Sequence, residues 1–292
     1  MTLDVIRLKA RVLAGQVYAG TFNIGGSLLR RIVPHDSALG AVKRRIAGWF
    51  RPQSKRKLAV MLEAFARAYP EARFVQIGSN DGMMEDPLRD SILKYRWQGV
   101  MVEPVPQLFE RLRSNYVGRA GLSFENVAVS SAEGMLPFYR IADPSGVASL
   151  PVWAPGLGSF SREVLLSHRN RIPGIENYIV ESQVPVVRFD TLCRRNGVQG
   201  IDLLHIDTEG HDYEILESID LARLLPRVVV YERHHLTAAQ QAACIARLEG
   251  LGYSCMHEGL DTFCVRIKDT SRRDAPLLAV WRALERIEEI PA

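Results

Sequence analysis

The stretch FVQIGSNDG, Phe74 to Gly82, runs from an apolar segment directly into a cluster of small and polar residues. The apolar half predicts a buried strand, and the polar half predicts a loop at the carboxyl end of that strand. Glycine permits positive φ angles and close approach to the backbone, and Asn80 and Asp81 tolerate the left-handed region. The loop therefore suits a ligand lying against the main chain, although a tight turn without any ligand explains the same residues.

Strand-like and helix-like segments alternate on both sides of this loop. The expected strands are 73–77, 99–103, 123–129, 135–141, 184–189, 201–207, 227–232, 254–257 and 262–267, and the main expected helices are 58–65, 87–95, 106–115, 162–168, 210–219, 237–251 and 277–290. This alternation predicts an α/β fold with a mostly parallel sheet and helices on both of its faces.

The same pattern predicts the domain organisation. Residues 58–270 would form the α/β domain, preceded by a basic helical extension, 1–57, and followed by a C-terminal helical segment, 271–292. The alternation stops between residues 142 and 182, and excursions of this length are either functional lids or disordered loops. The apolar residues of the segment 142–182 favour a lid or substrate insertion; they are Val152, Trp153, Leu157 and Phe160.

Glu103 ends the expected strand 99–103, 21 positions after Gly82. A carboxylate at this distance from a glycine loop binds the ribose of a nucleoside cofactor, because it can accept hydrogen bonds from both hydroxyls. A pyrophosphate cofactor would favour the G-x-G-x-x-G pattern, and the charge of Asp81 would repel its phosphates. S-adenosylmethionine carries an ammonium and a sulfonium group but no phosphate, so it fits better than NAD or FAD.

The composition is that of a globular protein, with 47% hydrophobic and 24% charged residues. The four cysteines, which show no CxxC spacing, are expected to be isolated buried thiols; they are Cys193, Cys244, Cys255 and Cys264. Isolated thiols are typical of a reducing compartment, so we expect a cytoplasmic protein. The sequence lacks an apolar run of 18 residues and a continuous signal-peptide core, so we expect no membrane-spanning segment.

The net charge of +4 conceals a strong asymmetry. Residues 1–57 carry 12 Lys and Arg against two Asp, and the remaining residues sum to −6. Val42, Ile46, Trp49 and Phe50 would share one face of a helix whose other faces are basic, which is typical of helices at an anionic membrane surface. This extension could instead dock on its own domain, or bind nucleic acid, which we consider the weaker alternative because no recognition module is present.

Six segments, in order, resemble the FkbM family of class I S-adenosylmethionine-dependent methyltransferases. They are VQIGSNDG, VEPVPQLFERLRSNY, ENVAVS, VRFDTL, IDLLHIDTEGHDYEIL and VVVYE, and the resemblance extends over roughly residues 73–232. The resemblance implies a Rossmann-like sheet of seven strands and O-methylation, commonly of a sugar in a glycan, glycolipid or natural product. The extension 1–57 and the segment 142–182 lie outside the resemblance, and we expect them to select the acceptor.

The resemblance also implies roles for matching residues. Gly78, Asn80, Asp81 and Gly82 would cradle the methionine part of the cofactor, Glu103 would bind the ribose, and Asn126 to Ala128 would border the adenine. The family usually carries lysine at the position of His205. Any role that this lysine has in the family therefore has no equivalent in this sequence. We expect His205 to be a core residue.

Carboxylates and histidines lie at the carboxyl ends of the strands 201–207 and 227–232 or directly after them. Asp207 would face the transferred methyl group together with Glu209, although both carboxylates could instead stabilise the next helix. Asp207 and Glu232 could hold Mg²⁺, which needs few protein ligands. A sugar hydroxyl needs a base to remove its proton, and the candidates are His234 and His211, each of which could also be a merely exposed or capping histidine.

Three alternatives remain open on the residues alone. The acceptor could be a small molecule other than a sugar, since the variable segments would form its pocket. The protein could bind nucleic acid through its basic extension, with the fold as a scaffold. An NAD-dependent oxidoreductase is disfavoured by Asp81 and by the missing middle glycine of the loop. We also expect that the extension can place the protein at the inner face of a membrane.

Overall fold

The computed structural model describes residues 56–142 and 150–288. The predicted helix that contains Trp49 and Phe50, and nearly all of the extension 1–57, lie outside the described residues. Among the helices that are described, none combines the length and the apolar character needed to cross a membrane.

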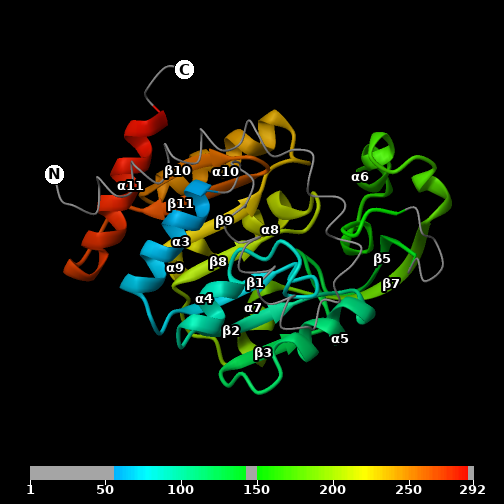
Figure 1. Ribbon diagram of the computed structural model, residues 1–292, viewed down its shortest axis with the longest axis horizontal. Coiled ribbons are helices and arrows are strands. Elements are labelled where there is room, and N and C mark those ends of the chain that lie inside the picture. Colours follow the sequence, from blue (N-terminus) through cyan, green and yellow to red (C-terminus); the bar gives the residue numbers. More distant parts are fainter. Residues whose placement is uncertain (1–55, 143–149, 289–292) are drawn as a thin grey trace, which may run out of the picture.

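The main sheet has seven strands in the order β10-β11-β9-β8-β1-β2-β3. Their bounds are β1 Arg73–Ile77, β2 Gln98–Val102, β3 Leu122–Glu125, β8 Leu203–Ile206, β9 Val228–Glu232, β10 Tyr253–Glu258 and β11 Asp261–Arg266. The pairs among β3, β2, β1, β8 and β9 are parallel, whereas β11 is antiparallel to both of its neighbours. The predicted α/β fold of the class I methyltransferase type, with a mostly parallel sheet of seven strands, is confirmed (Figure 1).

Helices cover both faces of this sheet because alternate strand residues face two different hydrophobic cores. Phe74 and Met101 point into the core that contains α3 Arg56–Ala68, α4 Arg89–Lys94 and α11 Ala275–Glu288. Val75 and Val102 point into the opposite core, with α7 Phe189–Arg195, α8 Asp212–Ser218, α9 Leu221–Leu224 and α10 Ala238–Gly250. Helix α5, Pro106–Asn115, adds Leu112 to the first core. Helices α3 and α11 lie side by side (Figure 1).

A second, four-stranded sheet has the order β4-β7-β5-β6. Its strands are β4 Ala128–Val129, β5 Gly134–Ile141, β6 Gly158–Ser159 and β7 Ile179–Val187. The prediction of one strand over 123–129 was therefore wrong, because β3 and β4 belong to different sheets. The chain turns between them at Asn126, whose side-chain amide donates hydrogen bonds to the carbonyl oxygens of Glu103 and Pro104 at 2.8 and 3.1 Å.

The insertion between β5 and β7 has regular structure and a small core of its own. It holds η3 Ala154–Gly156, β6, α6 Arg162–Ser167, η4 His168–Asn170 and η5 Ile175–Asn177, and it lies with β5 and β7 to one side of the main sheet (Figure 1). Leu157 is buried in its core with Leu165 and Ile172. The predicted helix at 162–168 is confirmed, whereas Val152, one of the apolar residues expected to favour a lid, is 85% exposed.

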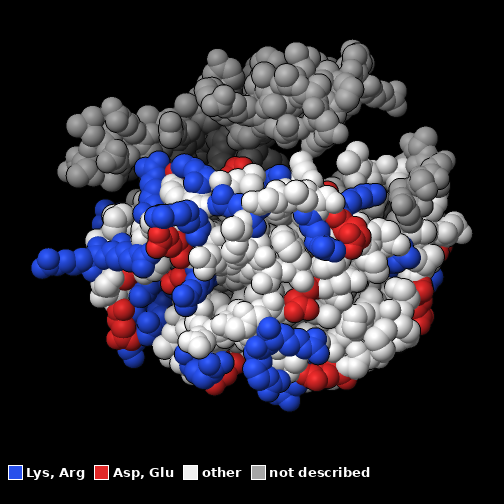
Figure 2. Space-filling view, turned by 90° about the horizontal axis from the view of Figure 1, so that it is seen from below, with Lys and Arg blue, Asp and Glu red and all other residues white. Residues whose placement is uncertain are grey.

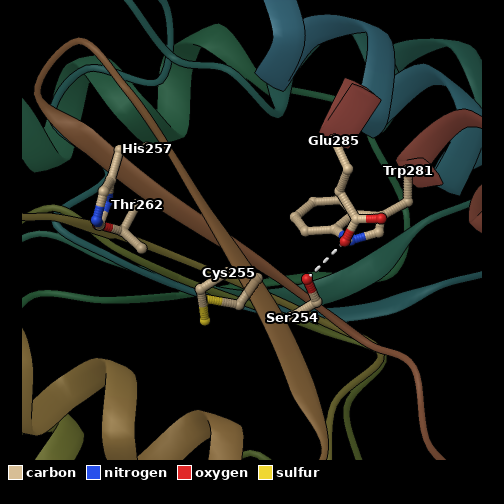
Figure 3. The surroundings of a disulfide bond; sticks show 7 residues. Ser254, Cys255, His257, Thr262, Trp281 and Glu285 are labelled. Atoms are coloured by element: carbon tan, nitrogen blue, oxygen red, sulfur yellow. Dashed lines mark hydrogen bonds between the residues drawn. A yellow bond between two sulfur atoms is a disulfide. The ribbon is translucent and has the colours of Figure 1, made fainter. Parts of the chain in front are cut away.

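The prediction of four isolated thiols was wrong for two of the cysteines. Cys255 on β10 and Cys264 on β11 face each other across the antiparallel pair, with Cα atoms 4.1 Å apart, and form a disulfide (Figure 3). Sequence spacing missed the bond because a hairpin brings together residues whose separation matches no motif. Cys193 and Cys244 are free and buried. The cysteine pattern therefore no longer supports the expectation of a reducing compartment.

The described surface carries both signs of charge. On the face that Figure 2 shows, Lys and Arg lie beside Asp and Glu around a broad uncharged area. The concentrated positive charge of the sequence belongs to residues 1–57, almost all of which fall outside the described part.

Candidate functional site

A cavity of about 300 Å³ lies at the carboxyl ends of the parallel strands. Its wall is formed by the ends of β1, β2, β8 and β9 and by the insertion, which contributes Trp153, Leu157 and His168. The structure thus brings the glycine loop, Glu103, the carboxylates at the ends of β8 and β9 and the insertion to one place.

The loop after β1 lies on this cavity through Gly78, Ser79 and Asn80. Gly78 has φ +81°, and a Cβ atom there would lie 1.7 Å from the carbonyl oxygen of Asp207, so only glycine lets the loop pack on the end of β8. Asn80 also has a positive φ, 51°. Gly82 does not line the cavity, since a Cβ atom there would meet Leu112 and Tyr116 beneath the loop.

Glu103 is 5% exposed and lines the same cavity. Its Oε2 accepts a hydrogen bond from the backbone N–H of Asn80, and its Oε1 accepts one from that of Val105, both at 2.9 Å. Burial raises the pKa of this carboxyl to about 7 against the effect of the two hydrogen bonds. Because a carboxylate has about four acceptor positions, lone pairs remain for hydroxyl donors.

Asp81 and Asn126 hold the loops rather than line the cavity. The Asp81 carboxylate accepts the backbone N–H groups of Met83 and Met84, both at 2.8 Å. Asn126 ties the end of β3 to the residues after β2, as described above. Ala128, by contrast, lines the cavity with Val127, Val129 and Phe138, which form an apolar wall near Glu103.

Three carboxylates gather in the same cavity. Asp207, Glu209 and Glu232 each place an oxygen within 4.8 Å of the other two. Burial and the neighbouring carboxylates, Asp207 first, raise the pKa of Glu232 to about 11, and its buried Oε2 has no hydrogen-bond partner among the described residues. Two or more ionised carboxylates at this distance repel each other unless a cation lies between them, so the group is suited to a hard divalent ion.

The histidines proposed from the sequence occupy different places. His234 lines the cavity, and burial together with His235 lowers the pKa of its imidazole, which favours the neutral ring. His211 does not line it, since its Nε2 lies 2.9 Å from Ser130 Oγ and its ring packs on Phe160. His205 is buried within β8, as expected, although it also reaches the cavity wall.

Sequence reasoning missed several residues of the site. His235 lies next to His234, and its Nε2 is 3.0 Å from Oε2 of Glu209. The insertion adds His168 and Arg171. The guanidinium carbon of Arg171 lies over the Trp153 ring, 4.8 Å from its centroid. The adjacency of His234 and His235 was a usable signal, whereas nothing in the spacing of His168 placed it beside residues 41 and 67 positions further along the chain.

Comparison with known proteins gives a family match. A family model described as the methyltransferase FkbM domain matches residues 76–255, which is more than half of the chain. No curated protein matches.

The chain is also similar to solved structures. A methyltransferase FkbM from Methylobacillus flagellatus KT shares 8% identity at a TM-score of 0.43, covering 67% of this chain and 44% of that one. The O-methyltransferase TomG from Streptomyces achromogenes, solved in complex with SAM, shares 12% identity at a TM-score of 0.38, covering 81% and 92%. This chain thus spans less than half the length of the Methylobacillus protein.

Proposed function

We propose that this protein, which belongs to the FkbM methyltransferase family, transfers a methyl group from S-adenosylmethionine to a hydroxyl group of a sugar. The observation that carries the proposal is a buried carboxylate, Glu103, that lines one cavity with the glycine loop after β1 and with the polar residues after β8 and β9. These are the parts that a nucleoside cofactor and an acceptor hydroxyl require.

The lining of the cavity fits the cofactor. Glu103 would accept hydrogen bonds from the ribose hydroxyls, the backbone of Gly78 to Asn80 would contact the methionine part, and the apolar wall at Ala128 would border the adenine. Asp207 and Glu209 give this end of the cavity the negative charge that suits a cation. When bound, S-adenosylmethionine supplies a methyl group on a positively charged sulfur atom. Asp81, Gly82 and Asn126 would act indirectly, by holding the loops.

His234 is the candidate base. As the acceptor oxygen forms its bond to the methyl carbon and the carbon–sulfur bond breaks, the imidazole would take the hydroxyl proton, and S-adenosylhomocysteine would leave. Its lowered pKa supports this role, because the neutral ring is the form that accepts a proton. His211 is the weaker candidate, since it faces Ser130 and Phe160.

Asp207 and Glu232, together with Glu209, would hold Mg²⁺. Their oxygen donors are those that Mg²⁺ prefers, and the buried Oε2 of Glu232 is otherwise without a partner among the described residues. Such an ion would add positive charge next to the acceptor oxygen and favour loss of its proton.

The acceptor side of the cavity supports a polyhydroxylated substrate. Arg171, His234, His235 and the three carboxylates offer hydrogen-bond donors and acceptors there, next to the Trp153 ring. A small molecule other than a sugar is the second candidate, because the insertion that forms this side lies outside the segments that resemble the family.

Calorimetric titration with S-adenosylhomocysteine tests the cofactor assignment. Wild-type protein should bind the product with micromolar affinity, and Glu103→Ala should lose that binding while keeping its circular dichroism spectrum. Binding that survives in Glu103→Ala would remove the ribose role, and a folded wild type that binds nothing, with or without Mg²⁺, would overturn the methyltransferase proposal. Incubation with S-adenosylmethionine and sets of sugars, followed by mass spectrometry, would then identify the acceptor.

A further inference from the structure

We propose that His168, Glu209 and His235 form a site for a first-row transition-metal ion of the Mn²⁺, Co²⁺ or Zn²⁺ class, next to the carboxylate group of Asp207, Glu209 and Glu232 and sharing Glu209 with it. Each of the three residues places one ligand atom within 4.8 Å of the ligand atoms of the other two. Ligand atoms bound to one such ion lie about 3–3.5 Å apart, so shifts of about 1 Å by these side chains would complete the site.

An independent observation at His168 points to a ligand. This residue is 8% exposed, and its Nε2 is buried without a hydrogen-bond partner in the described part of the chain. Its ring centroid lies 5.7 Å from that of the Trp153 ring and 5.6 Å from that of the His235 ring. A buried ring nitrogen without a partner is unfavourable, and coordination of an ion in the adjoining cavity would satisfy it.

The backbone around Glu209 is shaped to hold this arrangement. Glu209 adopts a φ of 50°, which is unfavourable for a residue with a Cβ atom. Ser159 of β6 donates a hydrogen bond to the Glu209 carbonyl oxygen at 2.7 Å. At Gly210 a Cβ atom would lie 3.1 Å from His235 and 3.2 Å from Val164 of α6, so the loop after β8 is packed between His235 and the helix that precedes His168.

The donor set decides the kind of ion. Two imidazoles with one carboxylate favour manganese, iron, cobalt or zinc, whereas Mg²⁺ prefers oxygen ligands alone. Glu209 also belongs to the carboxylate group with Asp207 and Glu232, so the two groups lie side by side and share one ligand.

The three ligands come from three separate parts of the chain. His168 belongs to the insertion, Glu209 follows β8 and His235 follows β9. An ion bound here would therefore fasten the insertion to the edge of the main sheet. If the proposed function is correct, the same ion would stand at the acceptor end of the cavity and could bind an oxygen of the acceptor.

Binding of Co²⁺ to the full-length protein, free of any affinity tag and stripped of metal, tests the proposal. We expect one Co²⁺ per chain in equilibrium dialysis, visible absorption bands typical of nitrogen and oxygen ligands, and no displacement by an equal concentration of Mg²⁺. His168→Gln and His235→Gln should each weaken Co²⁺ binding about tenfold or more. His257→Gln, a histidine on β10 away from the cavity, is the matched control and should bind as the wild type does.

Two results would overturn the proposal. One is wild-type protein that binds no Co²⁺, and the other is binding that Asp207→Asn abolishes while His168→Gln and His235→Gln leave it intact. Thermal unfolding of each variant establishes whether it is folded. If His168→Gln is not folded, His235→Gln alone serves as the test. Titration with S-adenosylhomocysteine in the absence of metal separates the two ideas: product binding without Co²⁺ binding removes the metal site alone, and Co²⁺ binding without product binding removes the proposed function alone.

Discussion

At the scale of single residues, Glu103 is deeply buried, and each of its carboxylate oxygens accepts one backbone hydrogen bond. Each oxygen can still accept another hydrogen bond. Its carboxyl has a pKa of about 7, well above the ordinary value, because burial disfavours the charged form. A ribose hydroxyl donates its hydrogen bond best to the ionised carboxylate. Cofactor binding should therefore lower this pKa and release a proton near neutral pH.

The affinity for S-adenosylhomocysteine should consequently rise between about pH 6 and pH 8 and then level off. Glu103→Gln should bind more weakly and lose this part of the pH dependence, because the amide cannot ionise. Calorimetry at several pH values, in two buffers with different ionisation enthalpies, measures both the affinity and the released proton. Equal pH dependence in wild type and Glu103→Gln would show that another group is responsible.

Gly78 makes a prediction about stability. Alanine at this position would combine an unfavourable φ with a contact 1.7 Å from the Asp207 carbonyl oxygen, so we expect a loss of about 2–5 kcal/mol of unfolding free energy. Gly118 has a similar φ, +78°, with nothing within 4 Å, so Gly118→Ala is the matched control and should cost about 1–2 kcal/mol. Urea unfolding compares the two. Similar losses of unfolding free energy in the two variants would mean that the loop can move away from β8 at little energetic cost.

At the scale of elements, the disulfide between β10 and β11 changes what is expected of the cysteines. Protein prepared without reductant should show two reactive thiols when denatured, those of Cys193 and Cys244, and four after reduction. Reduction should lower the unfolding free energy by about 3 kcal/mol or less, as the nine-residue separation implies. Thiol titration with a chromogenic disulfide reagent makes the first measurement. Four reactive thiols in unreduced, denatured protein would contradict the pairing.

The elements that could be predicted from sequence are those with a strong local period. Helix α5 begins at Pro106 and ends at Asn115 as expected, and α10 begins after Thr237, whose side chain forms a capping box with Gln240. The second sheet was missed because its pairing is not local. Strand β5 pairs with β7 over residues 134–141 and 179–186, on either side of the insertion. The local sequence of neither strand therefore indicates which strand it pairs with.

At the scale of the whole molecule, the basic surplus of residues 1–57 still suggests an anionic surface as a partner. We expect the full-length protein to associate with vesicles that contain anionic lipid, and not with neutral ones. Removal of residues 1–52 should abolish the association while leaving the affinity for S-adenosylhomocysteine unchanged, which also shows that the remaining domain is folded. A sedimentation assay measures vesicle binding, and a shortened protein that still sediments with anionic vesicles would contradict the membrane hypothesis.

The order of the strands explains how the site is assembled from distant segments. Strand β1 lies between β2 and β8, and β9 lies beside β8, so Gly78, Glu103, Asp207 and Glu232 reach one edge of the sheet although 154 positions separate the first from the last. Parallel pairing places all four strand ends on the same side. The resemblance to the FkbM family implied this arrangement of strand ends, and the described sheet has the same arrangement.

The sequence by itself determined the alternating α/β pattern, the glycine loop and the spacing of Glu103, because each depends on residues close together in the chain. Tertiary structure alone decided that Gly82 and Asn126 support loops, that His211 turns toward Ser130, that Cys255 and Cys264 form a bond, and that His168 meets Glu209 and His235. Those outcomes depend on which surfaces of distant segments pack against each other, and local periodicity carries no information about that packing.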